Sequence, residues 1–334
     1  MPMPFETERT RAHEMHESRM PIVSVIVAAY EAQAYLRDCL ESVLSQSIDA
    51  WECIVVDDGS RDATYSIAEE YRQRDARFIV LRQENRGQSA ARNAGAARAA
   101  RSSRYYWFLD SDDLLEEHAL KRASLYLDRH PDVVTVGVGF RKIDSMGGSL
   151  GRGHRSRWVP GRWMPRQLKP KEADTPFVAF FCVTGQGPYA LHRAAAFWKT
   201  AGYDPSLPSH EDCDLFCQMS LLGRVHYLPE VLYVYRVREG SMTSVGQERG
   251  GGERFLEKWL AMQGRDEREA RVLEHARAYY MRRHLPFRDL KVGILTIARF
   301  PAHRRVSSLR WGFGLVRSGL GALVRRPTDE DQPW

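Results

Sequence analysis

Short apolar segments alternate with segments of helical character over residues 22–129. The apolar segments, each expected to form a strand, are residues 22–27, 51–56, 78–81 and 105–109. The helical segments are residues 36–44, 63–73, 89–100 and 116–129. Strands that are apolar throughout are buried on both faces, and strands that alternate with helices pair in parallel. The chain is therefore expected to be an α/β protein with a mostly parallel sheet flanked by helices.

A polar group follows each of these four strands. The groups are Tyr30, then Asp57 with Asp58, then Asn85 with Arg86, and finally the cluster Asp110-Ser111-Asp112-Asp113. In a parallel sheet the carboxyl ends of the strands share one edge, and ligands bind just outside it. Each end alone has an ordinary reading as a turn, because Asp-Gly and Asn-x-Gly are common turn sequences. Four polar ends together predict a binding site.

The acidic cluster is the most informative of these ends. Packing does not call for three neighbouring carboxylates, because like charges repel. A divalent cation would offset the repulsion, and Mg²⁺ is often shared between carboxylates and a substrate phosphate. The alternative is a helix N-cap with an acidic first turn, since residues from Leu114 onward look helical. One aspartate would suffice for a cap, so the cluster favours a metal and phosphate site.

Longer stretches around these ends form a set that falls in one order along the chain. They are residues 23–30 (VSVIVAAY), 54–62 (IVVDDGSRD), 85–87 (NRG), 91–95 (ARNAG) and 110–113 (DSDD). The set resembles the family 2 glycosyltransferases, which have the GT-A (Rossmann-like) fold. The resemblance covers residues 22 to about 115 and extends more weakly to about 245. Two departures are Ala28-Ala29-Tyr30-Glu31, where the family often has Pro-x-Tyr-Asn, and Arg238, near a frequent histidine.

This resemblance implies a set of contacts with a nucleotide sugar. The implied residues are Ala28, Tyr30, Asp57, Asp58, Arg92, Asp110 and Asp112. Tyr30 is expected at the face of the base, and Asp58 at the uracil N3–H of a UDP-linked donor. Asp112 and Asp113 are expected to hold Mg²⁺ or Mn²⁺ against the diphosphate.

A second acidic pair, Glu211-Asp212, is expected to open a helix in the acceptor half of the domain. The family has a Glu-Asp pair whose aspartate is the general base, which implies that role for Asp212. One alternative is an acidic first turn favoured by the helix dipole. Another is that His210 is the base, because histidine titrates near neutrality. Glu211 is expected to orient a neighbour or the acceptor.

Two arginines, Arg236 and Arg238, follow an expected strand at residues 231–234. Arginine suits phosphate recognition, so both are candidates for contact with the diphosphate or the acceptor. The alternative is that they are simply solvated.

The chain is expected to have three parts. A flexible leader covers residues 1–20, a GT-A domain covers 21–248, and a basic, helical C-terminal extension covers 253–334. Within the domain, the nucleotide-sugar half runs to about residue 115 and the acceptor half from about 116. The leader lacks the apolar core of a signal peptide, and no apolar stretch is long enough to span a bilayer. The five cysteines, an odd count without export, indicate reduced thiols and a cytoplasmic protein.

The net charge of +6 is unevenly distributed. Residues 271–326 carry about +11 and the remainder about −5. Basic residues there are interleaved with Trp311 and Phe313, a combination that suits an anionic membrane surface. A solvated helical face is an equal alternative, whereas a nucleic-acid surface lacks any accompanying motif. Peripheral attachment to the inner face of the cell membrane is therefore one expectation.

The expected function is inverting transfer of a sugar from a UDP-linked donor to a hydroxyl of a glycan or lipid-linked glycan. The resemblance implies a role in bacterial polysaccharide or cell-envelope glycan synthesis. A nucleotidyltransferase would also use a parallel sheet and a metal, but it would carry a glycine-rich phosphate loop where this chain has residues 28–32. A non-catalytic nucleotide-sugar-binding module is disfavoured by the intact Asp112, Asp113 and Asp212.

Overall fold

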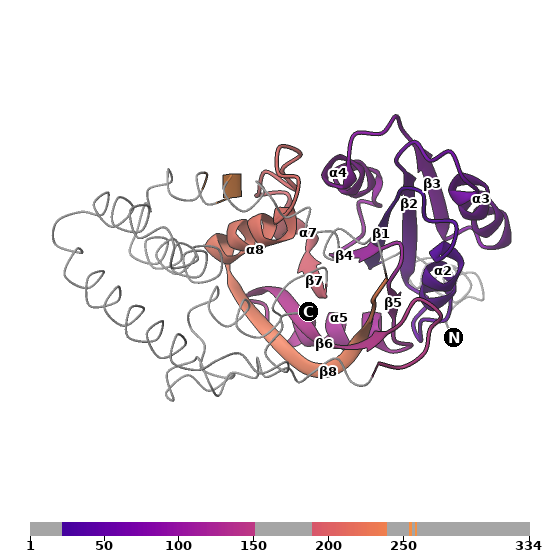
Figure 1. Ribbon diagram of the computed structural model, residues 1–334. Coiled ribbons are helices and arrows are strands. Elements are labelled where there is room, and N and C mark those ends of the chain that lie inside the picture. The colour runs from indigo at the N-terminus through magenta and orange to yellow at the C-terminus, as the bar shows by residue number, and fades with distance from the viewer. Residues whose placement is uncertain (1–21, 151–188, 239–253, 256–257, 259–334) are drawn as a thin grey trace, which may run out of the picture. The chain divides into compact units, whose positions relative to one another are not determined.

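The computed structural model describes residues 22–150, 189–238, 254–255 and 258, and their strands form one sheet (Figure 1). The strand order is β3-β2-β1-β4-β7-β6-β8-β5. The strands are β1 (Val23–Ala29), β2 (Trp51–Asp57), β3 (Phe78–Arg82), β4 (Tyr105–Asp110), β5 (Leu114–Leu115), β6 (Val133–Ile143), β7 (Ala190–Arg193) and β8 (Arg224–Arg236). The helices are α2 (Leu36–Leu44), α3 (Thr64–Arg74), α4 (Gln88–Arg98), α5 (Ala119–Arg129), α7 (Ala194–Phe197) and α8 (Glu211–Leu222). The long strand β8 curves strongly along its length (Figure 1).

The four strands predicted from the apolar segments are confirmed, and they pair in parallel. β1 pairs with β2 and with β4, and β2 pairs with β3. The register sets Ala29 beside Asp57 and Ala28 beside Asp110. The carboxyl ends of these strands therefore share one edge of the sheet, as the sequence predicts.

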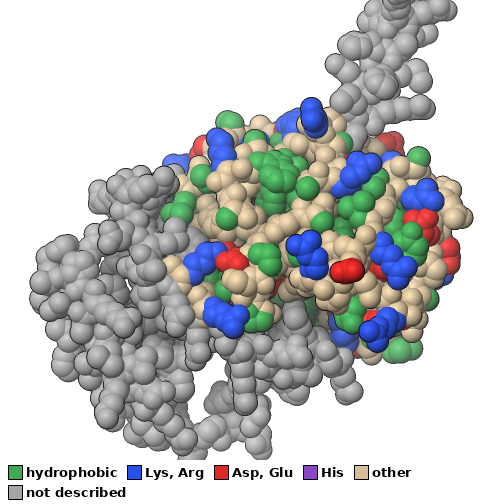
Figure 2. Space-filling model, turned by 90° about the horizontal axis from the view of Figure 1, so that it is seen from above, with side chains coloured by type: hydrophobic (Ala, Val, Ile, Leu, Met, Phe, Trp, Pro, Cys, Tyr) green, Lys and Arg blue, Asp and Glu red, His purple; other side chains and the backbone are tan. Residues whose placement is uncertain are grey.

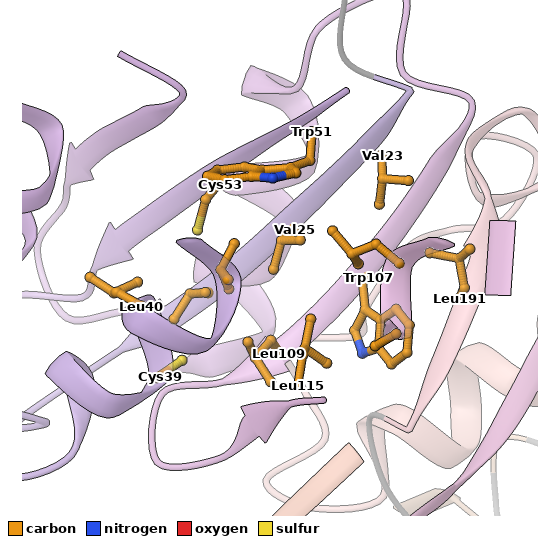
Figure 3. Packing of buried hydrophobic residues seen from close by; sticks show 14 of the residues in the cluster. Val23, Val25, Cys39, Leu40, Trp51, Cys53, Trp107, Leu109, Leu115 and Leu191 are labelled. Carbon is orange, nitrogen blue, oxygen red and sulfur yellow. The ribbon is translucent and has the colours of Figure 1, made fainter. Parts of the chain in front are cut away.

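Helices cover both faces of this parallel half. On one face, α2 and α3 share one hydrophobic cluster with β1, β2 and β4, in which Trp51, Cys53, Trp107 and Leu109 lie (Figure 3). The helix α5 packs against β6, β7 and β8 instead. On the other face, α4 approaches β1 so closely that a Cβ added at Gly95 would lie 2.5 Å from Ile26 Cγ2. Burial on both faces explains why these strands are apolar along their whole length.

The second half of the sheet differs from the prediction. β6 was not expected, and β8 runs well beyond the strand predicted at residues 231–234. β6 and β8 pair in parallel, whereas β7 pairs antiparallel with β4 and β6. Leu114 and Leu115 do not open a helix, because they form β5 and pair antiparallel with β8. The sheet is thus parallel in its first four strands and mixed beyond them.

The described residues all lie in the first of two compact units, Met1–Ala276 and Arg277–Trp334. The predicted leader and the basic segment 271–326 fall outside the described residues. Among the helices that the structure describes, none has the length and apolar character needed to cross a membrane. The four described cysteines, Cys39, Cys53, Cys213 and Cys217, are buried free thiols.

Charged side chains are scattered on one face of the described residues. On the face drawn in Figure 2, Lys and Arg side chains lie among hydrophobic and polar groups. The described residues of that face therefore present no continuous basic stripe of the kind that tracks a nucleic-acid backbone.

Candidate active site

The turn after β2 begins with a fully buried carboxylate, Asp57. Its Oδ2 atom lies 3.1 Å from Arg82 Nε, and its Oδ1 atom accepts a hydrogen bond from the backbone N–H of Ser60 at 3.2 Å. Arg82 Nη2 also donates to the Ser60 carbonyl at 3.1 Å. Asp57 therefore closes the turn and joins it to the end of β3.

The next residue, Asp58, is also buried and fixes the loop between β3 and α4. Its Oδ1 atom accepts hydrogen bonds from Gln83 Nε2 at 2.7 Å and from the Arg86 backbone N–H at 2.9 Å. Its Oδ2 atom accepts the backbone N–H of Gly87 at 2.8 Å. Asp58 thus fixes the loop that follows β3, beside the carboxyl ends of the parallel strands (the predicted donor edge). Its contact with a nucleotide base stays a prediction.

Tyr30 is an exposed aromatic side chain at this edge, with 52% of its surface accessible. It follows β1 directly, two residues after Ala28. The next residue, Glu31, has a φ of 50° and donates its backbone N–H to Ser60 Oγ at 3.0 Å. The loops after β1 and β2 are therefore tied together at the residue that follows the exposed Tyr30.

The acidic cluster after β4 is not a helix cap, since β5 follows it and α5 begins only at Ala119. Asp113 is buried, and both of its carboxylate oxygens accept hydrogen bonds. Tyr233 Oη donates to Oδ2 at 2.7 Å, and the Arg236 backbone N–H donates to Oδ1 at 2.7 Å. Burial, together with the charges of Asp112 and Asp110, raises the pKa of Asp113 well above its usual value.

Asp112 is the more accessible of the two predicted metal ligands. Its Oδ2 atom accepts a hydrogen bond from Arg238 Nε at 2.5 Å. Burial alone would lower the pKa of Arg238, but the contact with Asp112 raises it above its ordinary value. Among the described residues, no group of three or more His, Cys, Asp or Glu side chains could hold a metal by itself.

Arg236, in contrast, is buried, and all three of its guanidinium nitrogens donate hydrogen bonds to other protein groups. Its Nε atom donates to the Asp112 carbonyl at 2.9 Å, its Nη1 atom to the Ser145 carbonyl at 3.2 Å, and its Nη2 atom to Asp38 Oδ2 at 2.8 Å. Its guanidinium also lies 5.0 Å from the centre of the Tyr35 ring. Of the two arginines predicted to meet the diphosphate, Arg238 is the more exposed and Arg236 braces the acidic cluster.

Arg92 on α4 joins the acidic cluster to the acceptor half. It is buried, with Nη2 lying 2.6 Å from Asp110 Oδ1 and Nη1 lying 2.8 Å from Glu211 Oε1. Its guanidinium also lies 4.9 Å from the centre of the Tyr203 ring. Burial would lower the pKa of Arg92, but the charges of Asp110 and Glu211 raise it well above its ordinary value.

The Glu211-Asp212 pair opens α8, as the sequence predicts. Glu211 is buried, and burial followed by the charge of Asp212 raises its pKa above the ordinary value despite Arg92. Asp212 is partly exposed, and its Oδ1 atom accepts the backbone N–H of Cys213 at 2.7 Å. The residue before the pair, His210, has a left-handed φ of 67°. Of the two carboxylates, Asp212 is therefore the more accessible to solvent.

Asn93 is a further link between the two halves that the sequence analysis did not single out. Its Nδ2 atom donates to the Tyr203 carbonyl at 2.7 Å, and its Oδ1 atom accepts the Tyr203 backbone N–H at 2.9 Å. A Cβ added at Gly202 would lie 2.7 Å from Asn93 Oδ1. The signal was present in the 91–95 stretch, because Arg92, Asn93 and Gly95 each make one of the contacts that hold α4 between the halves.

Comparisons with known proteins agree with this fold. The family model described as "Glycosyl transferase family 2" matches residues 24–190. The uncharacterized glycosyltransferase EpsJ of Bacillus subtilis is 30% identical over 247 residues, which cover 72% of this chain and 69% of that protein. The chain belongs to glycosyl transferase family 2.

Two other relatives match over less of their own length. The putative glycosyltransferase EpsH of Bacillus subtilis is 50% identical over 96 residues, which cover 29% of this chain and 27% of EpsH. The minor teichoic acid biosynthesis protein GgaA of Bacillus subtilis is 32% identical over 224 residues, which cover 65% of this chain and 47% of GgaA. The chain thus spans less than half of each of these two relatives.

Solved structures share the GT-A fold at low sequence identity. The mannosyltransferase PcManGT from Pyrobaculum calidifontis, in complex with GDP-Man and Mn²⁺, has a TM-score of 0.60 and 18% identity. That match covers 92% of this chain and 82% of PcManGT. S. aureus TarS 1-349, in complex with UDP-GlcNAc, has a TM-score of 0.59 and 21% identity over 85% of this chain and 77% of that one.

Proposed function

We propose that this protein transfers a sugar from a UDP-linked donor to an acceptor hydroxyl, with inversion at the anomeric carbon. The observation that carries the proposal is the pair of ion contacts made by Arg92. One contact reaches Asp110 at the donor edge, and the other reaches Glu211, the neighbour of Asp212. A donor held over the carboxyl ends of β1, β2 and β4 would thus lie close to a carboxylate able to act as a base.

The donor half supplies an aromatic surface and a shaped edge. The exposed Tyr30 ring is suited to stack on a nucleobase. Asp58 is the proposed acceptor of the uracil N3–H, and its hold on the 83–87 loop would place that loop beside the base. Ala28 and Asp57 complete the edge at the ends of β1 and β2. The neighbour TarS, crystallised with UDP-GlcNAc, supports a UDP-linked donor.

The residues present fit a divalent cation that arrives with the diphosphate. Mg²⁺ in phosphate sites is usually held by one or two carboxylates together with substrate phosphates. Asp112 is the proposed protein ligand. Asp113, whose two oxygens already accept hydrogen bonds from Tyr233 and Arg236, holds the cluster in place. When bound, such a cation neutralises charge on the leaving diphosphate, and Arg238 lies close enough to Asp112 to share that task. The Mn²⁺ complex of PcManGT supports this assignment.

Asp212 is the proposed general base. It takes a proton from the acceptor hydroxyl, whose oxygen then attacks the anomeric carbon as the nucleoside diphosphate leaves from the opposite face. Glu211 is held by Arg92 and by Gln88 Nε2, which donates to its Oε1 atom at 2.6 Å. Glu211 therefore serves to orient the first turn of α8.

The proposed setting is synthesis of a bacterial polysaccharide or cell-envelope glycan on the cytoplasmic side of the membrane. The similarity to GgaA, a teichoic acid biosynthesis protein, supports this setting. The basic segment 271–326 is the proposed site of peripheral contact with anionic lipid. Co-sedimentation with anionic vesicles at low salt, lost at high salt, is the expected behaviour of the full chain.

The test is a screen of nucleotide sugars with Mn²⁺ that follows the products. Release of UDP together with glycosylation of an added acceptor supports transfer. Release of pyrophosphate would instead indicate a nucleotidyltransferase. Binding without release, seen as a thermal shift with no product, would indicate a non-catalytic module.

A further inference from the structure

A short segment beyond the predicted domain boundary contacts the loop and helix that carry Asp212. Lys258 Nζ lies 2.7 Å from Asp204 Oδ2 and 2.8 Å from Asp214 Oδ2. Asp214 belongs to the first turn of α8 and is fully buried, whereas Asp204 lies in the preceding loop. One ammonium group therefore joins this loop to the turn that contains Asp212.

Lys258 is suited to remain charged in this position. Burial would lower its pKa, but the hydrogen bonds and charges of Asp204 and Asp214 raise the pKa above its ordinary value. Asp204 accepts further hydrogen bonds from the Ser206 backbone N–H at 2.9 Å and from Ser206 Oγ at 2.7 Å. The loop before α8 is thus held by its own hydrogen bonds at Asp204, the residue that Lys258 contacts.

The same segment also contacts the residue immediately before the acidic pair. Phe255 is 2% exposed, and its ring centre lies 6.2 Å from that of His210 at an interplanar angle of 30°. Arg254 Nη1 donates to the Ser206 carbonyl at 3.0 Å. His210 has the left-handed φ that non-glycine residues avoid, and such a conformation persists only where its surroundings hold it.

Gln218, one turn further along α8, ties the helix to the same loop. Its Nε2 atom donates to Asp214 Oδ2 at 2.8 Å and to the Gly202 carbonyl at 3.1 Å, and its Oε1 atom accepts the Ala201 backbone N–H at 2.7 Å. Asp214 Oδ2 therefore receives hydrogen bonds from both Gln218 and Lys258. The described residues Arg254, Phe255 and Lys258 complete a set of contacts that fixes the first turn of α8.

We propose that Lys258 and Phe255 are positioning residues for Asp212. They fix the first turn of α8 and the left-handed His210, and through them the direction of the Asp212 carboxylate. The inference rests on the proposed role of Asp212 as the base. Small errors in the placement of a reacting group are costly, with about 1 Å able to reduce a rate by about 10²-fold. The donor edge lies at the carboxyl ends of β1, β2 and β4, whereas Lys258 and Phe255 contact the first turn of α8 and the residues before it. Donor binding is therefore expected to be unaffected.

The test compares Lys258→Met with Lys258→Arg and with Lys121→Met, which removes an exposed lysine on α5. Lys258→Met is expected to lower kcat by at least about 10-fold, with the donor KM and the Kd for UDP within about twofold of the unaltered protein. Lys258→Arg is expected to restore most of the loss, and Lys121→Met to change nothing. Phe255→Leu, which keeps an apolar side chain but removes the ring stacking, is expected to lower kcat in the same way.

A second measurement separates this inference from the proposed function. Amide hydrogen exchange of residues 204–214 is expected to be faster in Lys258→Met and Phe255→Leu than in the unaltered protein, and unchanged in Lys121→Met. Unchanged exchange there would overturn the inference whatever the activity. Unchanged kcat in a folded Lys258→Met or Phe255→Leu protein would also overturn it. No transfer by the unaltered protein from any nucleotide sugar would count against the proposed function instead.

Discussion

The guanidinium of Arg92 on α4 and the carboxylate of Glu211 on α8 lie 2.8 Å apart, measured from Nη1 to Oε1. Both side chains are buried, and 119 positions of sequence separate them. Because the other side of the guanidinium contacts Asp110 at the end of β4, a single side chain connects the two halves of the site. The donor edge and the first turn of α8 are therefore held in a fixed relation.

Replacing this arginine should destabilise the whole domain. Arg92→Met leaves the buried carboxylates of Asp110 and Glu211 without their cation, and breaking a buried ion pair costs about 3–5 kcal/mol. The free energy of unfolding, measured by urea titration, should fall by about that amount. The control is Arg37→Met, because Arg37 pairs with Glu70 while both side chains are more than half exposed, at 54% and 55%. Solvent screens that exposed pair, so it is expected to contribute far less than the buried one, and equal losses in the two variants would contradict the account.

The two neighbouring aspartates of the acidic cluster should respond differently to substitution. Asp112→Asn is expected to reduce the affinity for UDP in Mn²⁺ to the value seen in EDTA, because it weakens the proposed metal ligand. Asp113→Asn keeps an oxygen for the Arg236 backbone N–H and should retain most of the Mn²⁺-dependent gain in affinity. Titration calorimetry of UDP with and without Mn²⁺ measures both. Loss of the gain only in Asp113→Asn would reverse the assignment, and equal UDP affinity with Mn²⁺ and EDTA in the unaltered protein would remove the metal from the account.

Gly59 should tolerate a side chain less well than Gly87. Both have positive φ, at 79° and 85°, where an alanine costs about 1–2 kcal/mol in strain. At Gly59 an added Cβ would also lie 2.8 Å from the backbone nitrogen of Asn85, whereas nothing lies within 4 Å at Gly87. Gly59→Ala is therefore expected to lower the urea midpoint more than Gly87→Ala. Equal midpoints would mean that the backbone at Asn85 shifts away from the added Cβ without a loss of folding free energy.

The sequence predicted the parallel half of the sheet because burial on both faces leaves a plain apolar run. The strand β6 begins with a similar valine-rich run, residues 133–138 (VVTVGV), for which no strand was predicted, whereas β8 has a weaker signal. Gly139 interrupts β6 at a point where a Cβ would lie 2.7 Å from the Glu230 carbonyl oxygen, so the glycine permits the close approach of β8. Pro229 interrupts β8 beside a shift in register, a position at which a strand accepts proline. The glycine and the proline therefore mark the points at which the two strands depart from regular pairing.

The site was predictable as a set of residues but not as a set of contacts. Strand ends and the family resemblance placed Asp57, Asp58 and Asp110 on one edge. They gave no sign that Asp113 accepts hydrogen bonds from Tyr233 and Arg236, which lie more than 100 positions further along the chain. Such long-range pairs depend on the register between β5 and β8, which no local pattern encodes. The roles of these residues in binding and catalysis remain proposals.

Stability should decrease in mild acid because of a buried histidine, His192. Burial lowers its pKa from 6.5 to about 3, so the folded protein holds it neutral while the unfolded chain takes up a proton below about pH 6.5. The free energy of unfolding should therefore fall as the pH drops from about 6.5 toward 3, by at most about 1.4 kcal/mol per pH unit from this residue.

His192→Gln should flatten this part of the pH dependence, since glutamine does not titrate and retains a polar group for Thr135 Oγ1, which lies 3.0 Å from His192 Nδ1. His118→Gln, at an exposed position, is the control and should leave the slope unchanged. Thermal unfolding between pH 4 and 7 measures all three proteins. Equal slopes would show that His192 gains its proton without unfolding.

The most direct test of the account is the pair of activities in Asp212→Asn. The amide keeps the shape of the side chain and the hydrogen bond from the Cys213 backbone N–H, but it cannot accept the acceptor's proton. The account predicts that transfer from the nucleotide sugar falls by about 10²–10⁴-fold, the usual contribution of a general base, while the Kd for UDP stays within about twofold of that of the unaltered protein. Transfer close to the original rate would contradict the assignment and move the role to His210 or Glu211, and loss of UDP binding would place Asp212 in the donor site instead.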